Sequence, residues 1–137
     1  MGLTKKILVS ILLAQCFSTV IPAKLTQDYE TLHQTYVAKT KAMMKSFLST
    51  ISAELKAALL KGASSSCSDN FVGSVKTVID PRIEEMTKCY TSNTDTKVAE
   101  NCYKTTLAAI KKGAHDLHTD VKSCIRLSCI AIGLKNC

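Results

Sequence analysis

The sequence contains no tryptophan, and glycine, proline and aromatic residues are all scarce. Its 137 residues include 5 Gly, 2 Pro, 3 Phe and 4 Tyr. This scarcity argues against a β-sandwich, whose many turns need glycine and proline, and against a Gly/Pro-rich disordered chain. With 46% hydrophobic and 21% charged residues, the chain can bury a modest core, and its length limits it to one domain. We therefore expect an all-α fold.

Motifs with known catalytic or metal-binding chemistry are also missing. No Gly-x-Ser-x-Gly, P-loop, zinc-finger or EF-hand pattern occurs, and no Asn-x-Ser/Thr sequence for N-glycosylation. The one compact polar group is His115, Asp116 and His118, where two histidines can share a helix face. The His115-Asp116 pair resembles the catalytic helix of secreted phospholipases A2, but the preceding cysteine pair and a Gly-rich loop are absent. We expect a solvated helix face here, with no catalytic residue, metal site, cofactor or enzyme activity.

The first 23 residues have the features of a secretory signal peptide. Lys5-Lys6 forms a basic start, residues 7–21 are apolar but too few to span a bilayer comfortably, and Ala23 suits signal peptidase. Cleavage after Ala23 would leave residues 24–137 as a single secreted, extracellular domain. It would also remove Cys16 and leave six of the 7 cysteines, an even number suited to disulfides in an oxidising compartment. The alternative is that the segment stays as an N-terminal anchor.

Apolar residues at helical intervals predict a long amphipathic helix from Leu25 to Leu60. The stripe consists of Leu25, Tyr29, Leu32, Tyr36, Met43, Phe47, Ile51, Leu55 and Leu59. Thr26 can cap the start of this helix, and Gly62 marks its end. An unbroken helix of this length would be roughly 50 Å long. We therefore expect either a bend in it or a neighbour running beside it.

Further helices are predicted after the Ser64–Ser66 linker. A helical stripe resumes at Phe71 and meets Asp80-Pro81, where we expect a turn or kink, with Asp80 capping a new helix. Residues 91–96 predict a hairpin loop, and a last helix follows from about Asp95 to Ile125. The apolar side of that last helix would comprise Val98, Cys102, Ala109, Leu117, Val121 and Cys124, with Gly113 a weak point inside it. The apolar segment from Leu127 to Cys137 shows no assignable pattern.

The spacing of the cysteines predicts a disulfide ladder. Cys67 and Cys89 are 22 residues apart, and so are Cys102 and Cys124, which is close to six helical turns. In an antiparallel hairpin, residues whose numbers have equal sums face one another. The numbers of Cys67 and Cys124 add up to 191, as do those of Cys89 and Cys102. Of fifteen connectivities, we therefore predict Cys89–Cys102 and Cys67–Cys124, which leaves Cys129 and Cys137 for each other. The predicted architecture is a long N-terminal amphipathic helix packed on a disulfide-stapled antiparallel helical hairpin.

Part of this cysteine layout resembles the saposin-like proteins, small helical domains that bind lipids or lyse membranes. Cys89 and Cys102 resemble that family's central hairpin bridge, and Cys124 and Cys129 its closing pair of cysteines. The family opens with two cysteines three residues apart, whereas here Cys67 stands alone with Ser64 in its partner's place. Because of this departure the chain is not assigned to the family. The insect odorant-binding proteins fit less well, since their closely spaced second and third cysteines are missing.

These features favour a secreted, non-enzymatic binding protein that acts through an extracellular protein or a small apolar ligand held between helices. Adaptable side chains that could contact such a ligand or partner are Met43, Met44, Phe47, Phe71 and Met86, although an ordinary core would use them too. The alternative is a basic membrane-active or lipid-binding protein of saposin-like character. After cleavage, 16 basic and 11 acidic residues would remain, and Lys39, Lys41 and Lys45 form a basic patch that could meet an anionic membrane. With two arginines and few aromatics, nucleic-acid binding is not expected.

Overall fold

The described part of the chain is built from helices, with no strand among its residues. The computed structural model describes residues 27–92, 95–135 and 137. In chain order the elements are α2 (Gln27–Leu60), α3 (Ser66–Ser74), the π-helical segment η1 (Val75–Ile79), α4 (Asp80–Ser92) and α5 (Thr96–Ala131). The all-α class predicted from the composition is confirmed. The predicted signal peptide and the Thr26 cap lie outside the described residues.

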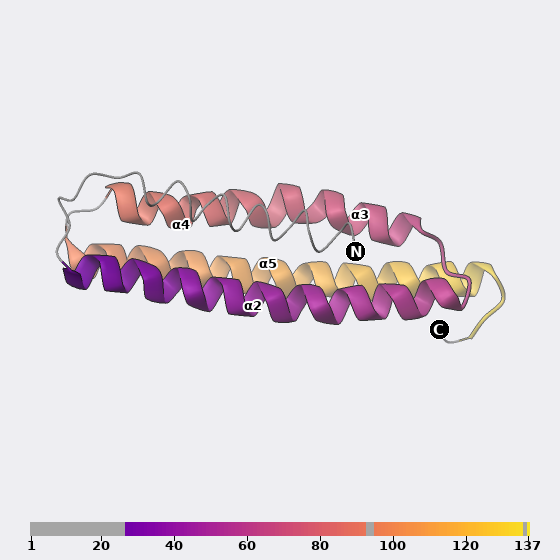
Figure 1. Ribbon diagram of the computed structural model, residues 1–137. Coiled ribbons are helices and arrows are strands. Elements are labelled where there is room, and N and C mark those ends of the chain that lie inside the picture. The colour runs from indigo at the N-terminus through magenta and orange to yellow at the C-terminus, as the bar shows by residue number, and fades with distance from the viewer. Residues whose placement is uncertain (1–26, 93–94, 136) are drawn as a thin grey trace.

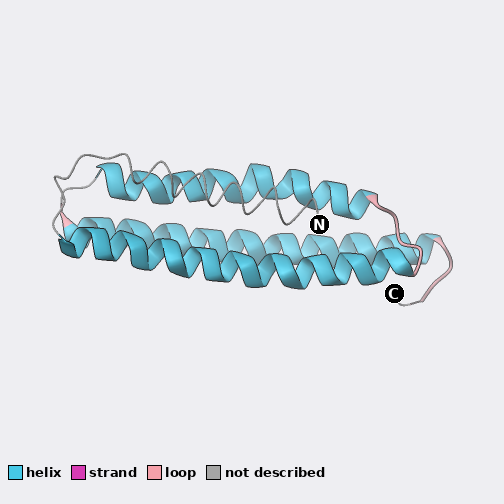
Figure 2. Cartoon of the chain, in the orientation of Figure 1, coloured by secondary structure: helices cyan, strands magenta, loops and turns pink. Residues whose placement is uncertain are grey.

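Three helical arms lie side by side (Figure 1): α2, the continuous α3–η1–α4 arm, and α5. α5 contacts all the other elements. With 34 and 36 residues, α2 and α5 are each about 50 Å long, and they run beside each other without a break (Figure 2). The end of α2, the start of α3 and the end of α5 therefore meet at one end of the molecule (Figure 1). Among the described residues, no helix combines the length and the apolar character that crossing a membrane requires.

The buried face of α2 includes polar residues that the apolar stripe left out. It consists of Tyr29, His33, Tyr36, Thr40, Met44, Leu48, Ile51, Leu55 and Ala58. The predicted stripe is therefore wrong in part, because Met43 and Phe47 are only partly buried and Leu59 is 41% exposed. Thr40 can occupy a core position because its hydroxyl donates to the carbonyl of Tyr36 at 2.8 Å. A search for apolar residues alone cannot detect such positions.

Gly62 ends α2, as predicted. Its φ of 98° lies in the left-handed region, which favours glycine, and the amide of Ala63 reaches back to the carbonyl of Ala58 at 3.0 Å. The chain then turns through Ser64 and Ser65 into α3. The predicted serine linker is thus found between the first two arms for Ser64 and Ser65, whereas Ser66 already belongs to α3.

The second arm continues through Asp80-Pro81 instead of breaking there. Asp80 has helical dihedrals, φ −57° and ψ −43°, whereas an N-cap residue has an extended backbone. The prediction that Asp80 caps a new helix is therefore wrong. Directly before the proline, η1 widens the helix, and the Asp80 amide donates to the carbonyl of Val75, five residues back. A π turn can accommodate the proline ring, which in a regular α-helix would clash with a carbonyl four residues earlier.

α5 begins where predicted but is longer than expected. The Asp95 side chain accepts hydrogen bonds from the amides of Lys97 at 2.8 Å and Val98 at 3.3 Å, which is an N-cap. Val98, expected on the apolar side, is 53% exposed. Gly113 lies where α5 approaches η1 closely, since a Cβ there would lie 3.2 Å from side-chain atoms of Val78 and Ile79. The helix runs on to Ala131 and takes in part of the segment that the sequence left unassigned.

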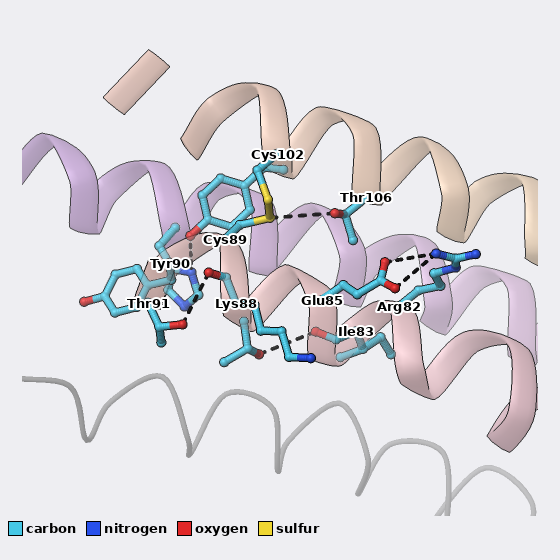
Figure 3. The surroundings of a disulfide bond; sticks show 12 residues. Arg82, Ile83, Glu85, Lys88, Cys89, Tyr90, Thr91, Cys102 and Thr106 are labelled. Carbon is cyan, nitrogen blue, oxygen red and sulfur yellow. Dashed lines mark hydrogen bonds and ion pairs between the residues drawn. A yellow bond between two sulfur atoms is a disulfide. The ribbon is translucent and has the colours of Figure 1, made fainter. Parts of the chain in front are cut away.

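The three disulfides join the pairs predicted from the cysteine spacing. Cys67–Cys124 links α3 to α5, Cys89–Cys102 links α4 to α5, and Cys129–Cys137 closes the C-terminal loop. Figure 3 shows the Cys89–Cys102 bridge between the two helices, with the Thr106 hydroxyl 3.7 Å from the Cys89 sulfur. α3, η1 and α4 are thus attached to α5 at both ends of the arm.

Candidate functional site

A pocket lies between the last turns of α2 and α5. Its volume is about 350 Å³, and it lies at the end of the molecule where the C-terminal loop folds back (Figure 1). We call it the basic pocket; its lining residues are Glu54, Ala57, Ala58, Lys122, Ile125, Arg126, Cys129, Lys135 and Cys137. The short side chains of Ala57 and Ala58 leave this space open, because a larger residue at either position would extend into it.

The C-terminal loop forms one wall of the basic pocket. After α5 the amide of Leu134 donates to the carbonyl of Cys129 at 3.0 Å, so the chain turns back on the helix. The Cys129–Cys137 bridge then fixes the loop to α5. Together these two links bring Lys135 to the pocket that the helices form.

The charges around the basic pocket are mostly positive. Lys122 and Arg126 lie one turn apart on α5 and, like Lys135, are exposed. In the described ranges none of these three cations takes part in an ion pair. Glu54 is the single carboxylate side chain in the lining, and both its oxygens contact Nε2 of His118, at 3.0 and 2.8 Å. The lining therefore has a net side-chain charge of about +2, since it combines three cations with one carboxylate.

Apolar side chains are exposed at the same end of the molecule. Of the eight exposed large hydrophobic residues in the described ranges, six belong to the last turn of α2, the last turns of α5 or the loop after it. We call these six the apolar rim: Leu59, Leu60, Leu127, Ile130, Ile132 and Leu134. Ile132, which follows α5, packs against the end of α2. Its Cδ1 is so close to Gly62 that a Cβ atom added to this glycine would lie 3.2 Å away. Clusters of exposed apolar residues of this kind commonly mark interaction surfaces.

A smaller pocket of about 140 Å³ lies beside the Cys67–Cys124 bridge. Phe71, Leu117 and Val121 line it together with Asp120. Its lining contains no basic residue.

The five residues predicted to contact a ligand come together as core. Met44, Phe71 and Met86 are buried, and Met43 and Phe47 pack against them. The rings of Phe47 and Phe71 lie 5.9 Å apart, edge to face. Their role in holding an apolar ligand stays a prediction.

The three lysines of the predicted basic patch do not share one helix face. Lys41 and Lys45 lie one turn apart on α2, but Lys39 is two residues from Lys41, about 200° around the axis. The Lys39 ammonium instead lies 5.1 Å from the centre of the Tyr36 ring. The patch is therefore divided between two sides of the helix.

The His115, Asp116 and His118 group separates in the same way. Asp116 pairs with Lys112 at 2.6 Å, His118 pairs with Glu54, and His115 is exposed. The described ranges contain no group of three His, Cys, Asp or Glu side chains that could hold a metal ion.

A buried histidine among tyrosines is the feature that sequence reasoning missed. Two tyrosines contact His33: its ring lies 4.2 Å from the Tyr90 ring and 5.8 Å from the Tyr103 ring. The other two tyrosines of the chain extend this cluster, because Tyr29 packs on Tyr90 and Tyr36 stacks on Tyr103. Nδ1 of His33 and the Tyr103 hydroxyl share a 2.7 Å hydrogen bond. The Tyr29 hydroxyl donates to the carbonyls of Cys89 and Tyr90, both at 3.1 Å, in the last turn of α4.

Burial shifts the ionisation of this cluster toward neutral forms. It lowers the pKa of His33 and raises that of Tyr103. Burial, followed by the hydrogen bond that its hydroxyl donates to Glu30 at 2.6 Å, raises the pKa of Tyr90 to about 12. Neither of the two pockets described above is lined by a residue of this cluster.

Comparison with known proteins gives no guide to the function. No family model, curated protein or solved structure matches the chain. Function therefore has to be argued from the geometry and chemistry of the basic pocket and the apolar rim.

Sequence reasoning missed the basic pocket as well, although one signal was available. No carboxylate side chain follows Asp120 in the sequence, whereas Lys122, Arg126 and Lys135 do. That imbalance coincides with the apolar stretch that starts at Leu127.

Proposed function

We propose that this protein is a secreted, non-enzymatic binding protein that attaches to anionic lipid surfaces. The observation that carries the proposal is the coincidence of the basic pocket and the apolar rim at one end of the molecule. A lipid surface presents anionic headgroups above an apolar layer, and these two properties complement the two surfaces. Of the two functions expected from the sequence, the lipid-binding alternative is the one that this geometry favours.

The magnitudes support reversible attachment. A basic side chain near an anionic leaflet contributes roughly 1 kcal/mol, and Lys122, Arg126 and Lys135 supply three. Complete burial of a leucine or isoleucine contributes roughly 1.5–3 kcal/mol. Leu60 is 81% exposed and Leu127 is 59% exposed. Much of the free energy of burying these two side chains can therefore still be gained when they enter the lipid. Both terms are needed, because ordering the protein at the surface opposes them.

Secretion forms part of the proposal. Lys5-Lys6, the apolar residues 7–21 and Ala23 support it, and so do three disulfides, which persist in oxidising compartments. We also propose that the long helix α2 and the stapled α3–α5 hairpin act as one rigid body that presents the binding end. Mass spectrometry of the protein from its secreting source should find residues 24–137, lighter by six hydrogens. Extra mass released on denaturation would instead support the small apolar ligand.

Co-sedimentation with vesicles tests lipid attachment. The protein should bind phosphatidylcholine vesicles that contain phosphatidylserine, and should bind less as salt rises, because salt screens the charges. The Leu127→Ser/Ile130→Ser variant should bind at least about tenfold more weakly, since two apolar side chains no longer enter the lipid.

Val98→Ser is the matched control for the rim variant. Val98 is 53% exposed, but it lies at the start of α5, the other end of the helix. Its substitution should leave vesicle binding unchanged. Equal losses for Val98→Ser and for the rim variant, or no binding by the parent protein, would contradict the proposal and point to a protein partner.

A further inference from the structure

The three cations of the basic pocket favour one kind of anion. Three cations and one carboxylate give its lining a net side-chain charge of about +2. The carboxylate of Glu54 lies 2.8 Å from Nε2 of His118, so its oxygens contact that imidazole and not a cation of the pocket, although its charge still counts in the lining. In the part of the chain that the structure describes, Lys122, Arg126 and Lys135 have no other ion-pair partner. A ligand that offers several anionic oxygens could pair with all three of these cations.

We infer that the basic pocket binds the phosphomonoester headgroup of a lipid, an inference that rests on the proposed function. A phosphomonoester carries about −1.5 to −2 charges at pH 7 and three strong acceptor oxygens. The Arg126 guanidinium can bind two of these oxygens in parallel, and Lys122 and Lys135 supply compact charges. A phosphodiester carries a single charge and only two free oxygens, so it can pair with fewer of the three cations.

The size and surroundings of the pocket favour a lipid over a soluble phosphate compound. Its volume of about 350 Å³ is at the lower end of the usual range for small-molecule sites and suits a headgroup without acyl chains. Ile130 lies one turn after Arg126 on α5, and Leu134 directly precedes Lys135. Apolar side chains of the rim therefore adjoin two of the three cations, where the chains of a bound lipid would leave the pocket.

Glu54 provides a variant that should gain affinity. Glu54→Gln removes the one carboxylate of the lining and keeps the shape of the side chain. Binding to anionic headgroups should rise about fivefold, which corresponds to one charge near the surface. Unfolding would abolish any preference between headgroups, so a gain for phosphatidic acid that keeps the preference reports the folded pocket and keeps the test valid if other variants are unstable.

The experiment measures binding to two sets of phosphatidylcholine vesicles of equal surface charge, one with phosphatidic acid and one with phosphatidylserine. The parent protein should prefer phosphatidic acid, a phosphomonoester, by about tenfold. Lys122→Gln/Arg126→Gln should lose that preference and bind on the order of 10- to 30-fold more weakly, since two cations are lost. The matched control is Lys97→Gln/Lys111→Gln, which removes two exposed lysines from the same helix outside the pocket. It should keep the preference.

The outcomes separate this inference from the proposed function. Equal binding to both vesicle sets would overturn the phosphomonoester site and leave lipid attachment standing. A second measurement is a calorimetric titration of the protein with inorganic phosphate. Suppose that the parent protein bound phosphate but neither vesicle set, and that the double variant no longer bound phosphate. The site would then bind a soluble phosphomonoester, and the proposed function would be wrong. If the protein bound neither the vesicles nor phosphate, both the inference and the proposed function would be wrong.

Discussion

At the scale of single residues, His33 shows how a polar side chain can be held in the core. It is 5% exposed, with Tyr103 as the hydrogen-bond partner of Nδ1. Nε2 has no hydrogen-bond partner among the described residues. The tyrosine rings around it exclude water, so the neutral imidazole is favoured, and burial lowers the pKa of His33. Glu30, the second contributor, acts in the opposite direction.

This shift predicts a loss of stability in mild acid. In the folded protein the pKa of His33 lies below its ordinary value of 6.5, whereas the unfolded chain takes up the proton at that value. Between these two values the unfolded state binds more protons, so the free energy of unfolding falls as the pH drops, by at most about 1.4 kcal/mol per pH unit. Denaturant titrations from about pH 7.5 to 5 would measure this slope.

His33→Gln should flatten the pH dependence, although the variant itself is expected to be less stable. His115→Gln replaces an exposed histidine on α5 and is the matched control. If the parent protein and His33→Gln showed the same slope, the buried imidazole would not be its source.

At the scale of elements, the helix ends are defined by local chemistry. Gly62 ends α2 through its positive φ, and Asp95 begins α5 by accepting two backbone hydrogen bonds. The end of α4 is capped by a residue from another helix, because the Tyr29 hydroxyl of α2 donates to carbonyls in the last turn of α4. Ends of this kind matter in a bundle whose connections between arms are short.

Removal of the Asp95 cap should weaken the bundle. Asp95→Ala leaves the amides of Lys97 and Val98 without their side-chain acceptor. The free energy of unfolding should fall by about 1 kcal/mol, within the 0.5–2 kcal/mol range of such caps. Asp95→Asn, which keeps an acceptor oxygen, should restore most of it in the same denaturation experiment. Equal losses for both variants would show that the carboxylate charge, and not the hydrogen bonds, is what matters.

At the scale of the whole molecule, the disulfides hold the α3–α4 arm on α5. The Cys67–Cys124 bridge closes a loop with a sequence separation of 57, whereas Cys89–Cys102 spans 13. Because a longer loop loses more freedom in the unfolded chain, the outer bridge should contribute about 4 kcal/mol and the inner one about 3 kcal/mol.

Paired cysteine-to-serine variants test this order. Cys67→Ser/Cys124→Ser should destabilise the protein more than Cys89→Ser/Cys102→Ser, as measured by denaturant unfolding. The single variant Cys67→Ser should free the thiol of Cys124, which alkylation and peptide mapping can locate. A free thiol at Cys129 instead would mean that the hairpin register is wrong.

The sequence predicted features that depend on local chemistry or on simple periodicity. The α2 boundary at Gly62, the Asp95 start of α5 and the three cysteine pairs all follow from turn residues, capping residues and helical spacing. It did not predict that the helix continues through Pro81, because the π turn before the proline lies where Val78 and Ile79 approach Gly113 of α5, a tertiary contact.

The sequence by itself determined the helical class, because amphipathic periodicity and the scarcity of glycine and proline act within each segment. Only the tertiary structure decided which polar residues are buried and where charges gather. His33 becomes a core residue because tyrosines from α2, α4 and α5 meet around it. Lys122, Arg126 and Lys135 become a site because α2 lies beside α5 and a disulfide folds the C-terminal loop back. The contacts of His33 with α4 and α5, and of α2 with α5, join residues far apart in the chain, and no local pattern encodes them.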